Sequence, residues 1–142
     1  MTGPASLDEP VWLSRNLLDA IHTDLIEQYG GSHGINDERL IESALARPKN
    51  TWGYIPESTL VSLAVSLAFG LTKNHGYRDG NKRTAFAATA VFLRLNGYQL
   101  MAPEAEAVSA MVYLATDVWD EDRFETWISD HIELAKPPLK VG

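Results

Sequence analysis

Two stretches of this sequence, about residues 57–73 and 81–96, have a helical spacing and are apolar on nearly every side. Leucine, valine and phenylalanine dominate the first, and alanine separates the larger apolar residues of the second. A helix without a polar face is buried inside a fold. A chain of 142 residues has room for one core of ordinary size. We therefore expect an all-α protein, one domain over residues 1–142, built around this buried central helix pair.

The other segments have the spacing of helices that cover the central pair, and about six helices are expected in all. The expected helices cover residues 14–29, 37–47, 57–73 and 81–96, with a fifth starting at 103 and a sixth after 120. Residues 48–56 combine aromatic residues and glycine without a helical period, so a loop or small hairpin flap is expected there. Residues 98–101 are expected to be extended, and the tail at 136–142, with its two prolines, to be flexible.

Composition excludes several classes of protein. There is no cysteine, which rules out disulfides and thiolate metal sites. The first ten residues lack a basic segment followed by an apolar run, and the longest apolar stretch, residues 60–71, is too short to span a membrane. A formal net charge of −7 argues against a DNA partner. We expect a cytoplasmic protein with no membrane partner.

The loop between the two buried helices contains residues whose chemistry suggests an active site. It reads His75-Gly76-Tyr77-Arg78-Asp79-Gly80-Asn81-Lys82-Arg83, and we call it the motif loop, residues 75–83. Four of the chain's 12 Lys and Arg residues lie between positions 73 and 83, where Asp79 is the only acid. An acidic protein thus has a local charge of about +3 here, as expected of a site that binds phosphate.

The end of the motif loop is suited to an anion, because it leads directly into a helix. The first amides of a helix have no intrahelical partner and lie at the positive end of its dipole. Lys82 and Arg83 add full charges there, and the Asp79 carboxylate is a hard oxygen ligand of the kind that Mg²⁺ accepts. His75 is the natural general base of the loop. These residues predict phosphoryl or nucleotidyl transfer to a hydroxyl, although a solvated turn with a helix cap would use the same residue types.

The motif loop resembles the signature H-x-F-x-D/E-G-N-x-R of the Fic/Doc superfamily, and more closely its Doc (death-on-curing) branch. Further runs that look like Doc-type sequences are residues 28–31, 42–48 and 81–86, so the resemblance covers most of residues 12–132. It implies ATP and Mg²⁺ as cofactors and a role for each polar residue of the loop. The implied roles are general base for His75, Mg²⁺ ligand for Asp79, phosphate cradle for Gly80, Asn81 and Lys82, phosphate contact for Arg83, and a weaker phosphate contact for Lys73.

Two positions indicate the subtype that the resemblance implies. Lys82 and Phe86 stand where the adenylyltransferase pattern G-N-G-R-x-x-R has its second glycine and second arginine. Doc toxins share both differences, and in that branch ATP is reversed so that the γ-phosphate faces the target. The resemblance then implies a toxin kinase that phosphorylates a threonine of elongation factor Tu, arrests translation and is inhibited by an antitoxin whose disordered segment folds into a groove. An adenylyltransferase and a degenerate binding protein remain the alternatives.

Five other residues have a structural interpretation. Gly76 and Tyr77 depart from the more usual Pro-Phe of the family; the tyrosine keeps an apolar anchor, whereas the glycine is expected to make the loop more mobile. His22, His33 and His131 share no metal-ligand spacing, so a structural or solvated role is expected for each.

Overall fold

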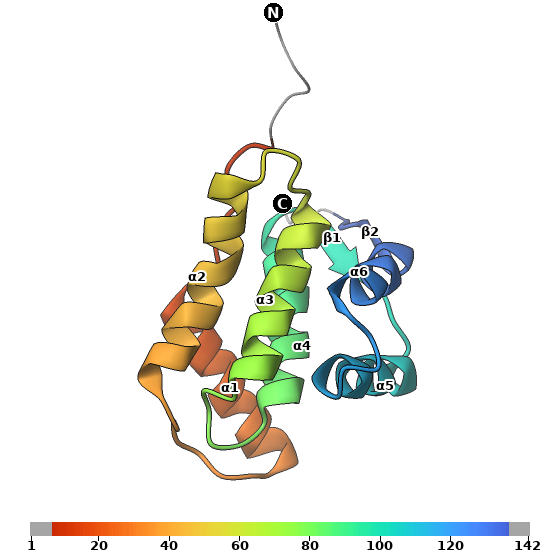
Figure 1. The fold of residues 1–142 in the computed structure, drawn as a ribbon. Helices are drawn as coiled ribbons and strands as arrows, with labels where there is room; N and C mark the ends of the chain where they lie inside the picture. Colours follow the sequence, from red (N-terminus) through yellow and green to blue (C-terminus); the bar gives the residue numbers. More distant parts are fainter. Residues whose placement is uncertain (1–6, 137–142) are drawn as a thin grey trace, which may run out of the picture.

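The computed structural model describes residues 7–136, and these form six α-helices and a two-stranded sheet. The helices are α1 (Arg15–Tyr29), α2 (Glu38–Tyr54), α3 (Leu60–Asn74), α4 (Asn81–Leu95), α5 (Glu104–Ala115) and α6 (Glu121–Asp130). In Figure 1, α3 and α4 run side by side through the middle, with α1 and α2 toward one side and α5 and α6 toward the other. The expected all-α architecture is confirmed.

The central pair supplies much of the core, as its composition predicts. Most residues of α3 between Leu63 and Thr72 are buried, and α4 contributes alanines together with Phe92 and Leu93. Helix α3 begins at Leu60, a few residues later than expected, because Thr59 and Ser62 form a reciprocal capping box. The two helices are antiparallel neighbours, so the short connection between them lies at one end of the core.

Helix α2 differs from the expectation, and the predicted flap at residues 48–56 is wrong. The helix does not stop at Pro48 but continues to Tyr54. Pro48 is buried, and the Thr51 hydroxyl donates to the carbonyl of Arg47 over 2.9 Å. One turn later, the Trp52 indole donates to the carbonyl of Leu7 over 3.0 Å. Packing of this last part of the helix therefore outweighs the loss of one backbone hydrogen bond at proline.

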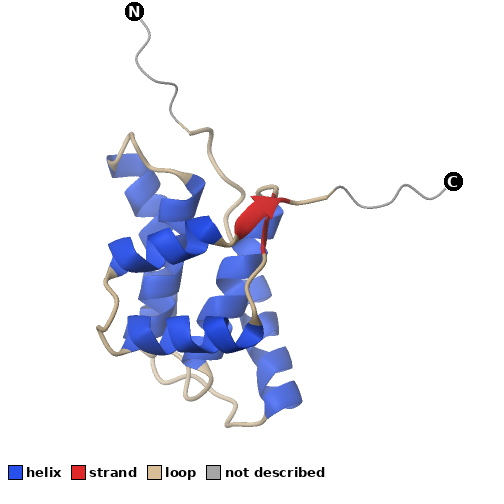
Figure 2. Ribbon diagram, turned by 90° about the vertical axis from the view of Figure 1, so that its right-hand side faces the viewer, coloured by secondary structure: helices blue, strands red, loops and turns tan. Residues whose placement is uncertain are grey.

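The extended piece after α4 is confirmed as strand β1 (Tyr98–Leu100), which pairs antiparallel with β2 (Ile132–Leu134). The pairing with β2 is not predicted from sequence. It brings the end of the described chain back to the end of α4, as Figure 2 shows for the two red strands. The expected flexible tail lies outside the described residues except for Lys136, which is exposed. Among residues 7–136, no helix is long and apolar enough to cross a membrane.

Candidate active site

The motif loop joins the C-terminus of α3 to the N-terminus of α4. His75 is the residue that ends α3, and its backbone has the left-handed conformation, with φ 51° and ψ 46°. Glycine is the usual residue at such a position, because a side chain is strained there. The His75 side chain is exposed, and within residues 7–136 its ring makes no hydrogen bond. A histidine kept where glycine is favoured, with a free ring, fits the predicted role of general base.

Asn81 holds the loop closed rather than pointing into solvent. Its side-chain oxygen accepts from the Tyr77 amide over 3.1 Å, and its side-chain nitrogen donates to the Tyr77 carbonyl over 2.8 Å. The residue is buried. Its contribution to the predicted phosphate cradle is therefore limited to the backbone amide, since the side chain is engaged on both sides.

The N-terminus of α4 is available to an anion. Gly80 precedes the helix with φ 76°, a left-handed conformation that favours glycine, and no described side chain caps the first amides. Lys82 and Arg83 are exposed beside these amides, and the Arg83 guanidinium lies over the Tyr29 ring, 4.9 Å from its centroid. Within residues 7–136, neither side chain forms an ion pair with a carboxylate. This arrangement has the features of a phosphate site.

Asp79 is exposed and held in place by the backbone. The Ser32 amide donates to Oδ2 over 3.1 Å, and the Gly80 amide donates to Oδ1 over 2.9 Å. These two bonds, helped by the nearby Arg83, lower the pKa of Asp79 below its ordinary value, so the carboxylate is ionised at neutral pH. No group of three acidic or histidine residues that could hold a metal occurs among residues 7–136. One fixed carboxylate suits Mg²⁺, which takes most of its ligands from phosphates and water.

The segment that lies against the motif loop is residues 30–37, between α1 and α2, and not the predicted flap at 48–56. Ile35 and Tyr77 form an isolated antiparallel bridge. The Asn36 amide donates to the carbonyl of Gly76 over 2.8 Å, and the Arg78 amide donates to the carbonyl of Gly34 over 3.0 Å. The three glycines of this segment were visible in the sequence, but no local pattern indicated which part of the chain they would contact.

Gly76 is closely packed, which argues against the expectation of a more mobile loop. A Cβ atom at this position would lie 2.4 Å from Cγ1 of Ile41, at the start of α2. The Gly76 carbonyl also accepts from the amides of Asn36 and Asp37. Glycine is therefore needed here because α2 approaches the loop closely, and its presence favours order at His75 rather than motion.

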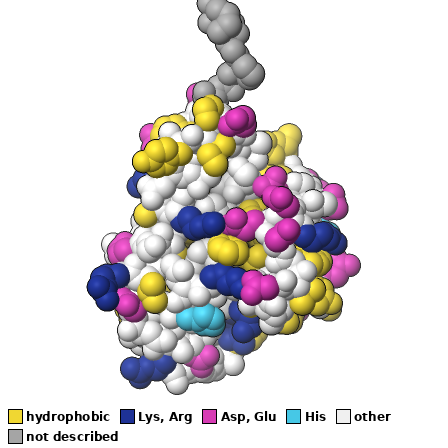
Figure 3. Space-filling view, viewed as in Figure 1, with side chains coloured by type: hydrophobic (Ala, Val, Ile, Leu, Met, Phe, Trp, Pro, Cys, Tyr) yellow, Lys and Arg dark blue, Asp and Glu magenta, His cyan; other side chains and the backbone are white. Residues whose placement is uncertain are grey.

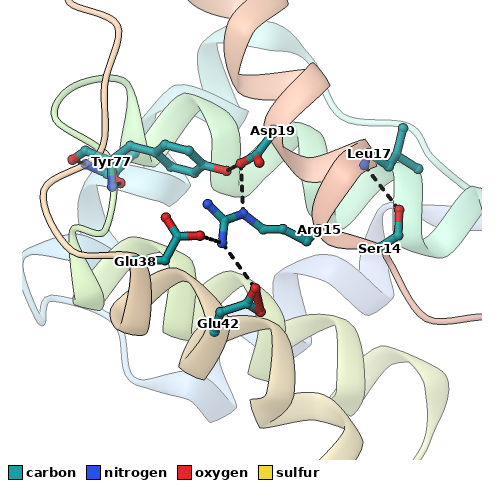
Figure 4. A network of polar contacts seen from close by, with 8 residues as sticks. Ser14, Arg15, Leu17, Asp19, Glu38, Glu42 and Tyr77 are labelled. Atoms are coloured by element: carbon teal, nitrogen blue, oxygen red, sulfur yellow. Dashed lines mark hydrogen bonds and ion pairs between the residues drawn. The ribbon is translucent and has the colours of Figure 1, made fainter.

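Tyr77 anchors the loop through its hydroxyl as well as its ring. The hydroxyl donates to Oδ1 of Asp19 over 2.6 Å, and burial together with this carboxylate raises the pKa of Tyr77 above its ordinary value. Asp19 also binds Arg15, which in turn pairs with Glu38 and Glu42 of α2 (Figure 4). The motif loop is thus tied by polar contacts to both α1 and α2.

Lys73 is placed differently from the other predicted phosphate contacts. Its ammonium pairs with Asp117, on the connection between α5 and α6, and donates to the carbonyl of Ala115, the last residue of α5, over 3.2 Å. These contacts direct the side chain to another part of the fold, and the structure does not bring Lys73 into the cradle at Gly80. The role of Lys73 in phosphate binding has no support from this arrangement.

The other three histidines have the expected structural or solvated environments. His22 is buried and is bonded to the backbone of the motif loop, with Nε2 2.8 Å from the Asp79 carbonyl oxygen. His33 is exposed and faces Glu27. His131 ends α6, and its Nδ1 lies 2.7 Å from the carbonyl oxygen of Trp127. The contact between His22 and Asp79 was not foreseen, because the two residues are 57 positions apart.

The arrangement concentrates reactive groups at one end of the core. On the face drawn in Figure 3, Lys and Arg side chains lie near a histidine at the lower end of the molecule, where the motif loop lies in Figure 1. A free imidazole, an ionised carboxylate and an uncapped helix N-terminus with two cations can together orient a nucleoside triphosphate and accept a proton. A wide surface hollow of about 990 Å³ lies at the opposite end, beside Leu60 and Asn96, and plays no part in this site.

Comparison with known proteins agrees with the geometry. A model of the Fic/DOC family matches residues 12–93, more than half of the chain. The chain is 43% identical over 75 residues to Toxin Doc of Mycolicibacterium smegmatis, covering 52% of this chain and 58% of that protein. It is 31% identical over 88 residues to Protein kinase doc of Escherichia phage P1, covering 62% of this chain and 70% of that protein. The first alignment spans less than two thirds of that relative's length. By the extent of the family match, which includes the motif loop, the chain belongs to the Fic/DOC family.

Proposed function

We propose that this chain is the toxin of a toxin–antitoxin pair and acts in the cytoplasm as a Mg²⁺-dependent protein kinase. The observation that carries the proposal is the free N-terminus of α4, where uncapped amides, Lys82 and Arg83 lie beside the fixed carboxylate of Asp79. The names of two relatives, a toxin and a protein kinase, support it. The proposed substrate is a threonine hydroxyl of a translation factor, with elongation factor Tu as the implied target.

In the proposed reaction, the threonine oxygen forms a bond to the γ-phosphorus of ATP. The bond from that phosphorus to the bridging oxygen breaks, and ADP leaves with the electron pair. The imidazole of His75 accepts the hydroxyl proton, for which its exposed ring, unpartnered among residues 7–136, is suited. Mg²⁺, when bound at Asp79, would neutralise phosphate charge, and the amides of the first turn of α4 would hold the phosphates.

Lys82 and Phe86 favour transfer of phosphate over transfer of the adenylyl group. Lys82 is exposed at the helix start, and Phe86, half-buried, packs against the core where the adenylyltransferase pattern has an arginine. An arginine that could contact a second phosphate group is therefore missing from that position. The alternative activity, adenylylation through the same loop, would leave a different group on the target.

The test uses ATP labelled in two positions with purified elongation factor Tu as the substrate. We expect label from γ-labelled ATP on the target and none from α-labelled ATP. The reverse pattern would replace the kinase by an adenylyltransferase. Absence of transfer from both, with nucleotide still bound, would support a binding protein without chemistry.

The toxin role predicts that the chain is harmful unless a partner is present. The proposed antitoxin segment is disordered alone and folds as an amphipathic helix into a groove of this domain. Expression of the wild-type chain should arrest growth, the His75→Ala form should be tolerated, and co-expression of the neighbouring gene should restore growth. Normal growth with abundant wild-type protein in its own host would contradict the toxin role.

A further inference from the structure

One face of α1 runs beneath the motif loop and contacts it at four successive points. The positions on α1 are spaced by three, four and three residues, which places them on one side of a helix. The first two contacts are hydrogen bonds, from the Tyr77 hydroxyl to Asp19 and between His22 and the Asp79 carbonyl. The third is packing of Ile26 on Gly80, where an added Cβ would lie 3.1 Å from Cδ1 of Ile26. In the fourth, the Arg83 guanidinium lies over the ring of Tyr29. The face therefore follows the loop from Tyr77 to the first turn of α4.

His22 makes the central contact on this face. The residue is 4% exposed, and its ring stacks on Tyr77 with the centroids 3.9 Å apart and the planes 10° from parallel. Nε2 lies 2.8 Å from the carbonyl oxygen of Asp79. A carbonyl oxygen only accepts hydrogen bonds, so Nε2 must carry the proton in this contact. The ring is thus held by stacking on one motif residue and by donation to another.

The bonded carbonyl belongs to the peptide group that joins Asp79 to Gly80. In a trans peptide the C=O and N–H bonds are coplanar and point in opposite directions. When His22 fixes the carbonyl, it also aims the Gly80 amide away from α1, and that amide donates to Oδ1 of Asp79 over 2.9 Å. One of the two hydrogen bonds that hold the carboxylate therefore comes from a rigid peptide group whose carbonyl is bonded to His22, and the other comes from the Ser32 amide.

We propose that His22 is a positioning residue for the metal-binding carboxylate of Asp79. It acts through the Asp79–Gly80 peptide and does not touch the substrate. The proposal rests on the proposed function insofar as Asp79 binds the metal, and it adds a residue outside the motif loop to that site. Groups that orient a metal ligand from behind typically change metal affinity or activity by roughly 10- to 100-fold when removed.

The main test compares His22→Phe with the wild-type protein. Phenylalanine keeps a ring that can stack on Tyr77 and removes the donor. We expect the concentration of Mn²⁺ that half-saturates the protein in the presence of ADP to rise roughly 10-fold or more, as measured by electron paramagnetic resonance. Amide exchange at Gly80 should become faster by a similar factor in the metal-free variant. His22→Gln, whose amide can donate to the same carbonyl, should recover most of the metal affinity.

A matched control is His131→Phe, which removes another ring contact to a backbone carbonyl, at Trp127 and outside the loop. This control should leave metal affinity and Gly80 exchange unchanged. If folded His22→Phe bound Mn²⁺ as tightly as the wild-type protein, the proposal would be overturned. Mn²⁺ affinity and amide exchange at Gly80 are measured without catalysis. Failure of the wild-type protein to transfer phosphate would therefore refute the proposed function, whereas these two measurements would still decide whether His22 positions Asp79.

A measurement on the unaltered chain covers the case in which His22→Phe does not fold. Nitrogen chemical shifts of the histidine ring should show a proton on Nε2, and that proton should be protected from exchange. Addition of Mn²⁺ and ADP should broaden the His22 signals and leave those of His131 sharp. A proton on Nδ1 with a bare Nε2 would overturn the proposal.

Discussion

Two cationic regions of this protein, one at Arg15 and one at Lys82 and Arg83, have opposite surroundings. Arg15 is mostly buried and pairs with three carboxylates, those of Asp19, Glu38 and Glu42. The hydrogen bond to Glu38 contributes most to raising the pKa of Arg15, so it remains charged at any accessible pH. Lys82 and Arg83 are exposed and, among residues 7–136, have no carboxylate partner.

The difference distinguishes a charge that maintains the fold from a charge that is available to a ligand. Arg15 satisfies acids from α1 and α2, and its removal would leave them facing one another. Lys82 and Arg83 lie beside uncapped amides, where a bound phosphate could pair with both cations and accept hydrogen bonds from the amides. Charge alone therefore does not identify the site, whereas charge without an internal partner does.

The largest expected effect concerns the base of the motif loop and does not involve stability. His75→Ala should reduce phosphoryl transfer by roughly 10²- to 10⁴-fold, the usual contribution of a general base. The unfolding midpoint should change little, because the His75 side chain is exposed and its ring makes no hydrogen bond among residues 7–136. Transfer of label and thermal unfolding should be measured on the same sample. His33→Ala, at another exposed histidine, is the control and should retain activity.

A second prediction tests whether the loop is held by close packing. Gly76→Ala should reduce the free energy of unfolding by about 1–3 kcal/mol, since the new Cβ would overlap Cγ1 of Ile41. Gly53→Ala is the matched control, because a Cβ there meets nothing within 4 Å and glycine inside a helix is unfavourable. Urea denaturation should show a lower free energy of unfolding for Gly76→Ala and no decrease for Gly53→Ala. Equal stability of both variants would argue for a loop that can adapt.

A third prediction compares the same substitution, arginine to methionine, in the two cationic regions. Arg15→Met should destabilise the fold by about 1–3 kcal/mol, a range between exposed and buried ion pairs, and should leave the contacts of Arg83 in place. Arg83→Met should change stability by less than about 1 kcal/mol and weaken nucleotide binding roughly 10- to 100-fold. Denaturation and calorimetric titration with ATP would separate the two effects. If both variants lost stability equally, the distinction between the groups would fail.

The smallest expected effect is a dependence on alkaline pH. Tyr77→Phe removes the hydrogen bond to Asp19, so its free energy of unfolding at neutral pH should be about 1 kcal/mol lower than that of the wild-type protein. Because folding raises the pKa of Tyr77, the protonated hydroxyl stabilises the fold below about pH 10, the ordinary tyrosine value, and this contribution is lost as pH rises through the folded pKa. Above about pH 10, the stability of the wild-type protein should fall progressively toward that of Tyr77→Phe as the pH rises toward the folded pKa. Parallel curves for the two proteins would show that Tyr77 titrates normally.

Much of the fold could be predicted because it depends on local patterns. The starts of α1 and α6 follow Ser14 and Asp120, whose side chains each accept from the amide of the third residue of the helix. The central pair was visible from its lack of a polar face. The prediction for the end of α2 is wrong because proline usually ends a helix. No local sequence pattern indicates that Trp52 will donate to the backbone carbonyl of Leu7.

The sequence by itself determined the motif loop, its place before a helix, and the residues that bring charge to it, because helix ends and side-chain chemistry are local properties. Tertiary structure decided which of those residues are free to act. It engages Lys73 with Asp117, uses Asn81 to close the loop and brings His22 against Asp79. The contacts of Lys73 and His22 join residues 44 and 57 positions apart, and only the packing of the other helices around the central pair selects them.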